Sequence, residues 1–134
     1  MHSKIMYVEL KTGYLHNGPA WIGRVMLSKE GQTAYFNQRE FCKARSWRAN
    51  YCDIETGEEY WISEVKKKGR DRHAAGFGKI NIDEKVVAEY LRMTKQKALD
   101  RKKFKEVIIL DIFPSERHLR SNSQTDGLGA ALGL

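Results

Sequence analysis

The chain has 134 residues, of which 41% are hydrophobic and 31% are charged, and its formal net charge is +7. This length fits one domain, and the composition excludes a largely disordered chain. The sequence contains no run of about 18 apolar residues and no apolar stretch typical of a secretory signal, so we expect no membrane span and a cytoplasmic location.

The first half of the chain alternates short apolar runs with turn signals, which predicts antiparallel strands. The expected strands are 4–10, 20–27 and 33–37. The turn residues at 29–32 join the second and third strands as a hairpin, and Gly23 marks a bulge or a close approach. Residues 38–49 show no clean period, and we interpret them as a loop or a short helical turn.

The second half begins with another hairpin, in which strands 51–54 and 59–65 flank Gly57, followed by a short strand at 79–82. Asp83 then occupies the position of a helix N-cap. The helix that follows has one apolar face, and the sequence leaves open whether it ends near Thr94 or continues to about 103.

Residues 104–113 contain the β-branched run 107–110 and end before Pro114, which predicts a buried strand. These elements predict an α+β fold that is mostly β: a small antiparallel barrel, SH3-like or partly open, packed on a C-terminal helix. We expect a compact domain at 1–94, a basic extension with an apolar strand-like segment at 95–114, and a flexible tail at 115–134.

The aromatic residues of the strands are expected to fill the core before any of them can face a ligand. We predict that Trp21, Phe36 and one of Tyr60 and Trp61 are buried.

Five short motifs lie between residues 6 and 91: YVELKTG at 7–13, GPAWIG at 18–23, YFN at 35–37, ETGEEYWIS at 55–63 and DRH at 71–73. With these motifs the chain resembles a group of short bacterial proteins of undetermined function, some of which carry an automatically assigned deoxyxylulose-phosphate synthase name. That activity is not implied here, because such a thiamine-diphosphate enzyme is several times longer and its cofactor motif does not occur in this sequence. The resemblance implies a bacterial cytoplasmic protein with one compact domain, and it implies no catalytic residue.

The positive charge is concentrated in two windows. Residues 65–79 carry six basic residues against one acid, and residues 92–105 carry seven against one. Clustered Lys and Arg beside aromatic strands are typical of surfaces that bind RNA or DNA through the phosphate backbone. The predicted nucleic-acid-binding residues are Lys66, Lys67, Lys68, Arg70, Arg72, His73, Lys79, Arg101, Lys102 and Lys103.

The same residues also fit a solvated loop and a solvated helix face, and two other functions stay open. The apolar segment 104–113 favours docking to a protein partner, as in a subunit or regulator encoded on a bacterial mobile element. His73 between basic residues would suit acid–base catalysis in a metal-independent nuclease. We expect no metal and no cofactor, and we interpret Cys42 and Cys52 as reduced structural thiols.

Overall fold

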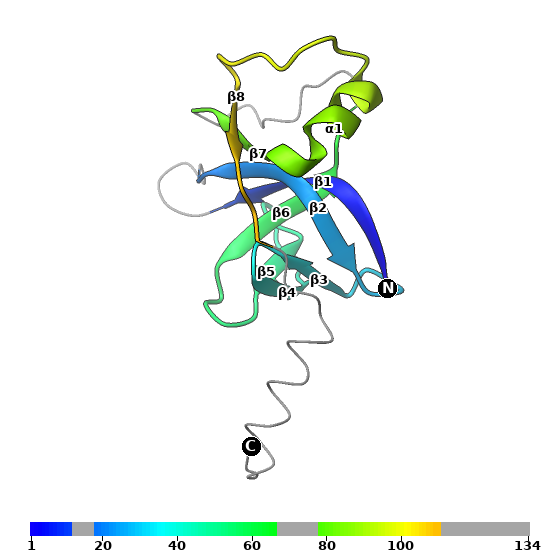
Figure 1. The fold of residues 1–134 in the computed structure, drawn as a ribbon. Helices are drawn as coiled ribbons and strands as arrows, with labels where there is room; N and C mark the ends of the chain where they lie inside the picture. Colours follow the sequence, from blue (N-terminus) through cyan, green and yellow to red (C-terminus); the bar gives the residue numbers. More distant parts are fainter. Residues whose placement is uncertain (12–17, 67–77, 111–134) are drawn as a thin grey trace.

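The computed structural model describes residues 1–11, 18–66 and 78–110 (Figure 1). Eight strands are present in this part of the chain, with one short 3-10 helix and one α-helix. The elements in chain order are β1 (His2–Leu10), β2 (Ala20–Leu27), β3 (Thr33–Phe36), β4 (Arg39–Lys43), β5 (Tyr51–Asp53), β6 (Glu59–Glu64), β7 (Ile80–Asp83), η2 (Glu84–Val86), α1 (Val87–Thr94) and β8 (Phe104–Val107).

The first six strands form a closed antiparallel barrel in the order β1-β6-β5-β4-β3-β2, which the pairing of β1 with β2 closes. The predicted α+β fold with a small, mostly β, SH3-like barrel is confirmed. Along one edge, strand β2 pairs with two other strands. Its first half pairs with β7 in parallel, and its last two residues pair with β3 in antiparallel orientation. Strand β8 then adds to β7, also in parallel, so the last two strands extend the sheet outside the barrel.

Strand β4 corrects our interpretation of residues 38–49 as a loop or helical turn, because residues 39–43 form a strand. Phe36 pairs directly with Arg39, so Asn37 and Gln38 make a two-residue hairpin turn with φ values of 52° and 63°. Such turns need positive φ at both central residues, which Asn followed by Gly signals strongly and Asn followed by Gln does not. The hairpin was therefore hard to see in the sequence.

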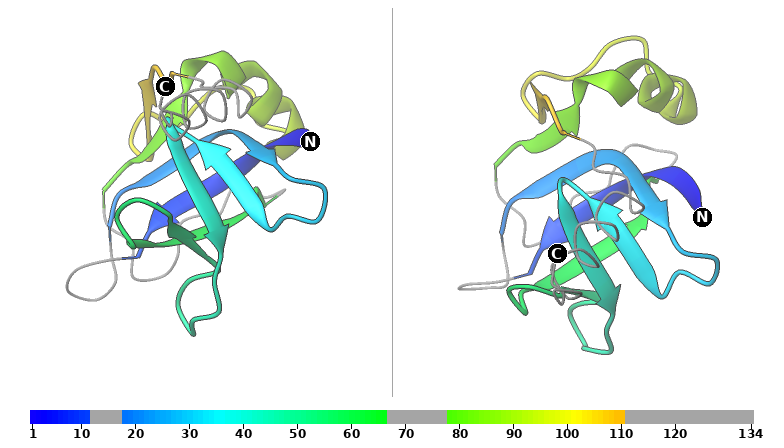
Figure 2. Two further views of the ribbon diagram at one scale, coloured as in Figure 1. Left: turned by 90° about the horizontal axis from the view of Figure 1, so that it is seen from below. Right: turned by 60° about the horizontal axis from the view of Figure 1, so that its bottom comes forward.

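Two apolar cores lie on the two sides of β1 and β2. The interior core fills the barrel and consists of Met6, Val8, Val25, Leu27, Ala34, Phe36, Phe41, Tyr51, Tyr60, Ile62 and Ile109. The outer core lies between the barrel and the layer of β7, α1 and β8 and consists of Ile5, Tyr7, Ala20, Ile22, Ile80, Ile82, Val86, Tyr90 and Phe104. Figures 1 and 2 show this second layer on one side of the barrel.

The aromatic predictions are largely confirmed. Phe36 and Tyr60 are buried, but Trp21 is only half-buried. Trp21 packs against the interior core without being fully enclosed by it. The expected close approach at Gly23 is confirmed, because a Cβ there would lie 2.7 Å from Cε1 of Phe36.

The helical segment starts and stops at specific residues. Asp83 caps η2 by accepting a hydrogen bond from the backbone N–H of Lys85, as predicted. α1 ends at Thr94, because Lys95 adopts a left-handed conformation with φ of 56° and closes the helix. This settles the open question of its length in favour of the shorter helix.

The prediction of one buried strand over 104–113 is wrong for residues 108–110. β8 ends at Val107, and the residues beyond it alternate: Ile109 is 3% exposed, whereas Ile108 and Leu110 are 70% and 59% exposed. The carbonyl of Ile109 accepts a hydrogen bond of 2.6 Å from Nζ of Lys85, which holds this segment against η2. Residues 111–113 and the predicted tail at 115–134 lie outside the described residues.

Candidate nucleic-acid interface

The structure describes half of the ten predicted nucleic-acid-binding residues. Lys66 is exposed just after β6, and Lys79, Arg101, Lys102 and Lys103 are exposed around the starts of β7 and β8. The other five, Lys67, Lys68, Arg70, Arg72 and His73, lie outside the described residues. The site can therefore be built from β7 and β8.

The parallel pairing of β7 with β8 brings the described end of the first basic window beside the second window. Ile80 pairs with Phe104, and its backbone N–H donates a hydrogen bond of 2.8 Å to the carbonyl of Lys103. Lys79, the last cation of the first window, therefore lies beside Lys103 in the second. With the neighbouring exposed residues, Lys79, Lys102, Lys103 and Lys105 form what we call the lysine cluster.

Arg101 differs from the lysine cluster because its guanidinium is ion-paired with Glu106. The pair lies within one β-turn and strand, and it offsets the charge of Arg101 locally. Of the predicted residues in this region, Arg101 is thus the least suited to hold a phosphate.

Most cations of the barrel are also paired with carboxylates. The pairs are Lys4–Glu64 at 3.3 Å, Lys11–Glu9 at 2.9 Å, Arg24–Glu89 and Arg39–Asp53 at 2.7 Å each, and Arg48–Glu59. In contrast, no member of the lysine cluster forms an ion pair with another described residue. The uncompensated positive charge of the described chain is therefore concentrated on the layer outside the barrel.

The loop between β4 and β5 presents a site that the sequence prediction missed. Trp47 is 82% exposed, and the guanidinium of Arg48 lies 5.8 Å from its ring centre. The loop is well anchored, because the Asn50 side chain makes hydrogen bonds of 2.7 and 2.8 Å with the backbone of Ile62. Arg45, also exposed, is close in the chain. An exposed indole on an anchored loop beside cations is typical of a surface on which bases stack. The sequence shows Trp47 among basic residues, but it does not show its exposure.

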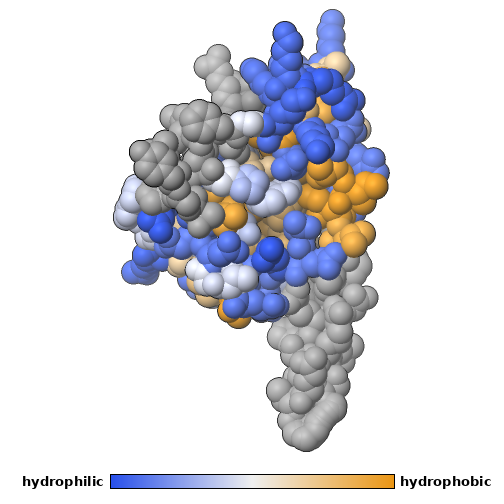
Figure 3. Space-filling view, turned by 90° about the vertical axis from the view of Figure 1, so that its left-hand side faces the viewer, coloured by the Kyte–Doolittle hydropathy of each residue, from blue (hydrophilic) through white to orange (hydrophobic). Residues whose placement is uncertain are grey.

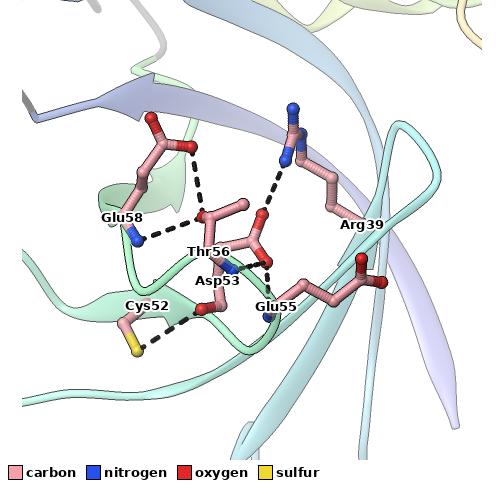
Figure 4. Close-up of polar contacts among 6 residues, drawn as sticks. All are labelled: Arg39, Cys52, Asp53, Glu55, Thr56 and Glu58. Carbon is pink, nitrogen blue, oxygen red and sulfur yellow. Dashed lines mark hydrogen bonds and ion pairs between the residues drawn. The ribbon is translucent and has the colours of Figure 1, made fainter.

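A shallow hollow of about 270 Å³ near the β5–β6 turn is lined by Arg39, Asp53 and Glu55, together with Asn37 and Gln38. Figure 4 shows the polar contacts that Asp53 makes with Arg39 and with the turn. The buried carboxylate of Asp53 accepts hydrogen bonds from Arg39 at 2.7 Å and from the backbone N–H groups of Glu55 and Thr56 at 2.8 and 3.3 Å. Burial alone would raise the pKa of Asp53, but these hydrogen bonds outweigh it and hold the pKa below its ordinary value. Asp53 thus binds both the β5–β6 turn and Arg39 of β4, so its carboxylate is suited to holding the β5–β6 hairpin against β4.

Within the described residues, no helix has the length and apolarity needed to cross a bilayer, and no group of three or more His, Cys, Asp or Glu side chains could hold a metal ion. The chain matches no protein-family model, no curated protein and no solved structure. The resemblance to the short bacterial proteins therefore stays a prediction.

We predict that Asp53→Asn lowers the free energy of unfolding at pH 7 by about 1–3 kcal/mol, because the charged partner of Arg39 is lost. A carboxyl group whose pKa is lowered by folding stabilises the protein above its unfolded pKa, near pH 4, and this contribution disappears as the pH falls through the folded pKa. The difference between wild type and variant should therefore shrink below about pH 4.

Urea unfolding at a series of pH values measures this difference. Glu30→Gln is the control, since Glu30 is exposed and forms no ion pair with a described residue. A cost of Asp53→Asn that is the same at pH 7 and pH 3 would contradict the assignment.

Proposed function

We propose that the protein binds RNA or DNA, mainly through the phosphate backbone, with the lysine cluster at the centre of the contact. The observation that supports this most is that Lys79 lies beside Lys103 where β7 pairs with β8, and that no lysine of the cluster forms an ion pair with another described residue. Lysine side chains at such a surface bind phosphates as point charges and release the counterions condensed on the nucleic acid. Backbone contacts of this kind give little discrimination between base sequences.

The remaining predicted residues of the first window extend this proposal. Lys66 and Lys79 are the described ends of the connection from β6 to β7, and the residues between them include Lys67, Lys68 and Arg70. We propose that these residues, with Arg72 and His73, add phosphate contacts beside the lysine cluster.

Trp47 supports a preference for single strands within the same proposal. Base stacking on an exposed aromatic ring requires unpaired bases, whereas phosphate contacts do not. The indole of Trp47 and the exposed Arg45 would then contact bases and backbone of a single strand.

A second proposed function, docking to a protein partner, is favoured by a different observation. β8 is the last strand of the sheet and pairs only with β7, so the described sheet has a free edge at β8. Ile108 and Leu110, which follow it, expose large apolar side chains. Figure 3 shows a face of the molecule on which an apolar area adjoins largely hydrophilic surface. An extended partner segment could pair with such an edge and cover the apolar side chains.

We predict that replacing Lys79, Lys103 and Lys105 together by Gln reduces the affinity for random-sequence DNA. The negative slope of log K against log salt should become shallower by about 2–3, because three phosphate contacts are lost. Fluorescence anisotropy with labelled oligonucleotides across a salt series measures both quantities. The matched control replaces Lys4, Arg24 and Lys29 by Gln, which removes the same number of charges from the barrel. An equal effect of the control, or no binding by the wild type at low salt, would refute the proposal. Charge reversal at Lys67, Lys68, Arg70 and Arg72 tests the proposed contacts of these four residues separately and should also weaken binding.

Trp47→Ala should weaken binding to single strands by about 5- to 150-fold, the usual value of one stacked base, and change binding to duplexes far less. Trp47→Phe keeps an aromatic face and should retain most of the affinity. Titrations with matched single-stranded and duplex oligonucleotides measure the effect. Equal losses on both substrates would exclude base stacking at Trp47.

For the second function, we predict that Ile108→Lys with Leu110→Lys abolishes capture of a specific protein from nuclease-treated bacterial lysate and leaves nucleic-acid binding intact. Substitution is preferable to truncation after Thr94, because Phe104 and Ile109 are buried in the two cores. Ile54→Lys, at a residue that is 52% exposed elsewhere, is the control. The docking proposal fails if the double variant captures the same proteins as the wild type.

A further inference from the structure

The two cysteines of the chain lie directly opposite each other on neighbouring strands. Cys42 of β4 pairs with Cys52 of β5, and their sulfur atoms are 3.9 Å apart. Both side chains are half-buried. They lie on the outer face of the barrel wall, since Phe41 and Tyr51, their neighbours in sequence, point into the interior core.

The strand register places the two cysteines within reach of a disulfide. The ladder hydrogen bonds at 44–50 and 40–54 put Cys42 and Cys52 at a hydrogen-bonded position, where opposite Cα atoms are about 5.5 Å apart, within the range that a disulfide spans. Two backbone hydrogen bonds of 3.0 Å flank the pair and fix its register, from Ala44 N–H to the Asn50 carbonyl and from Ile54 N–H to the Glu40 carbonyl. Bond formation therefore requires rotation of the two side chains and no change of strand pairing.

We propose that Cys42 and Cys52 form a reversible cross-strand disulfide, with the disulfide of a small thiol such as glutathione as the oxidant. This inference is independent of nucleic-acid binding. The thiolate of one cysteine attacks the small disulfide, which forms a mixed disulfide and releases one small thiol. The second cysteine, as its thiolate, then attacks the protein-bound sulfur and releases the second small thiol. Two electrons pass from the protein to the oxidant, which takes up the two thiol protons.

The surroundings of Cys52 favour its protonated thiol. On the other side of β5, Cys52 also pairs with Glu59 of β6. Burial, followed by the hydrogen bond with Cys42, raises the pKa of the Cys52 thiol. A protonated thiol is not a nucleophile, so Cys52 does not react indiscriminately.

The disulfide would close a covalent ring around the β4–β5 loop that carries Trp47. Cross-linking a loop of this length restricts the unfolded chain, and for a protein of this size we expect a rise in melting temperature on the order of 10 °C. The oxidised state would thus stabilise both the barrel wall and the loop.

The test uses the full chain, incubated under native conditions with oxidised glutathione. Free thiols are then blocked with N-ethylmaleimide and the protein is measured by intact mass spectrometry. We expect both thiols to become inaccessible to the reagent, with no glutathione retained and no covalent dimer, and dithiothreitol to restore both. A proteolytic digest should show the segments around Cys42 and Cys52 linked, which needs no variant.

Cys42→Ser and Cys52→Ser are the matched controls. Each should retain one glutathione on its single cysteine and should melt at a temperature that oxidation does not raise. Three results would overturn the proposal: two reactive thiols after oxidation, glutathione on both cysteines without an internal link, or a link that forms only in denaturant.

Discussion

The outer core on β1 and β2 is the constraint on which the rest of the structure depends. Strand β1 buries both of its faces, so the barrel needs a second layer over its outer side. Tyr90 of α1 and Phe104 of β8 supply that cover, and their rings meet edge to face with centres 5.6 Å apart. Because Phe104 is fixed there, the residues on either side of it stay at the surface beside β7. The position of the lysine cluster is therefore a consequence of apolar packing.

Buried charges in this structure are paired, whereas the charges of the lysine cluster are exposed to solvent. Glu9 and Lys11 at the end of β1 are almost completely buried, and they form an ion pair of 2.9 Å to which Tyr7 donates a further hydrogen bond. A buried charge without such partners would cost several kcal/mol. The lysine cluster has no comparable set of partners, and its charges are tolerated because water solvates them. These exposed charges are the ones left available to an external polyanion.

Local patterns in the sequence were sufficient for much of the fold but for little of the site. The alternation of apolar and polar residues and the turn residues predicted β1, β2 and the hairpin at Gly57. Asp83 predicted the start of the helical segment. Each of these features depends on residues close in the sequence. The β3–β4 turn was missed because Gln38 is an unusual residue for positive φ. Because β4 was not predicted, the pairing of Cys42 with Cys52 could not be predicted either. The position of Lys79 beside Lys103 depends on a parallel register across 23 intervening residues, which no local pattern encodes.

The lysines of β8 also have a purely structural explanation, which accounts for only part of the cluster. Edge strands often carry Lys because a charged side chain discourages pairing with the edge of another molecule. That reasoning covers Lys103 and Lys105, which flank the first residue of the edge strand. It does not cover Lys79, the cluster member that precedes the inner strand β7. Edge protection also does not explain Arg92 and Lys95, two further cations at the end of α1 that are not part of the cluster. Exposed cations thus lie on α1 as well as along β7 and β8 of the second layer, an arrangement that the proposed contact with an extended polyanion would use and that edge protection alone does not explain.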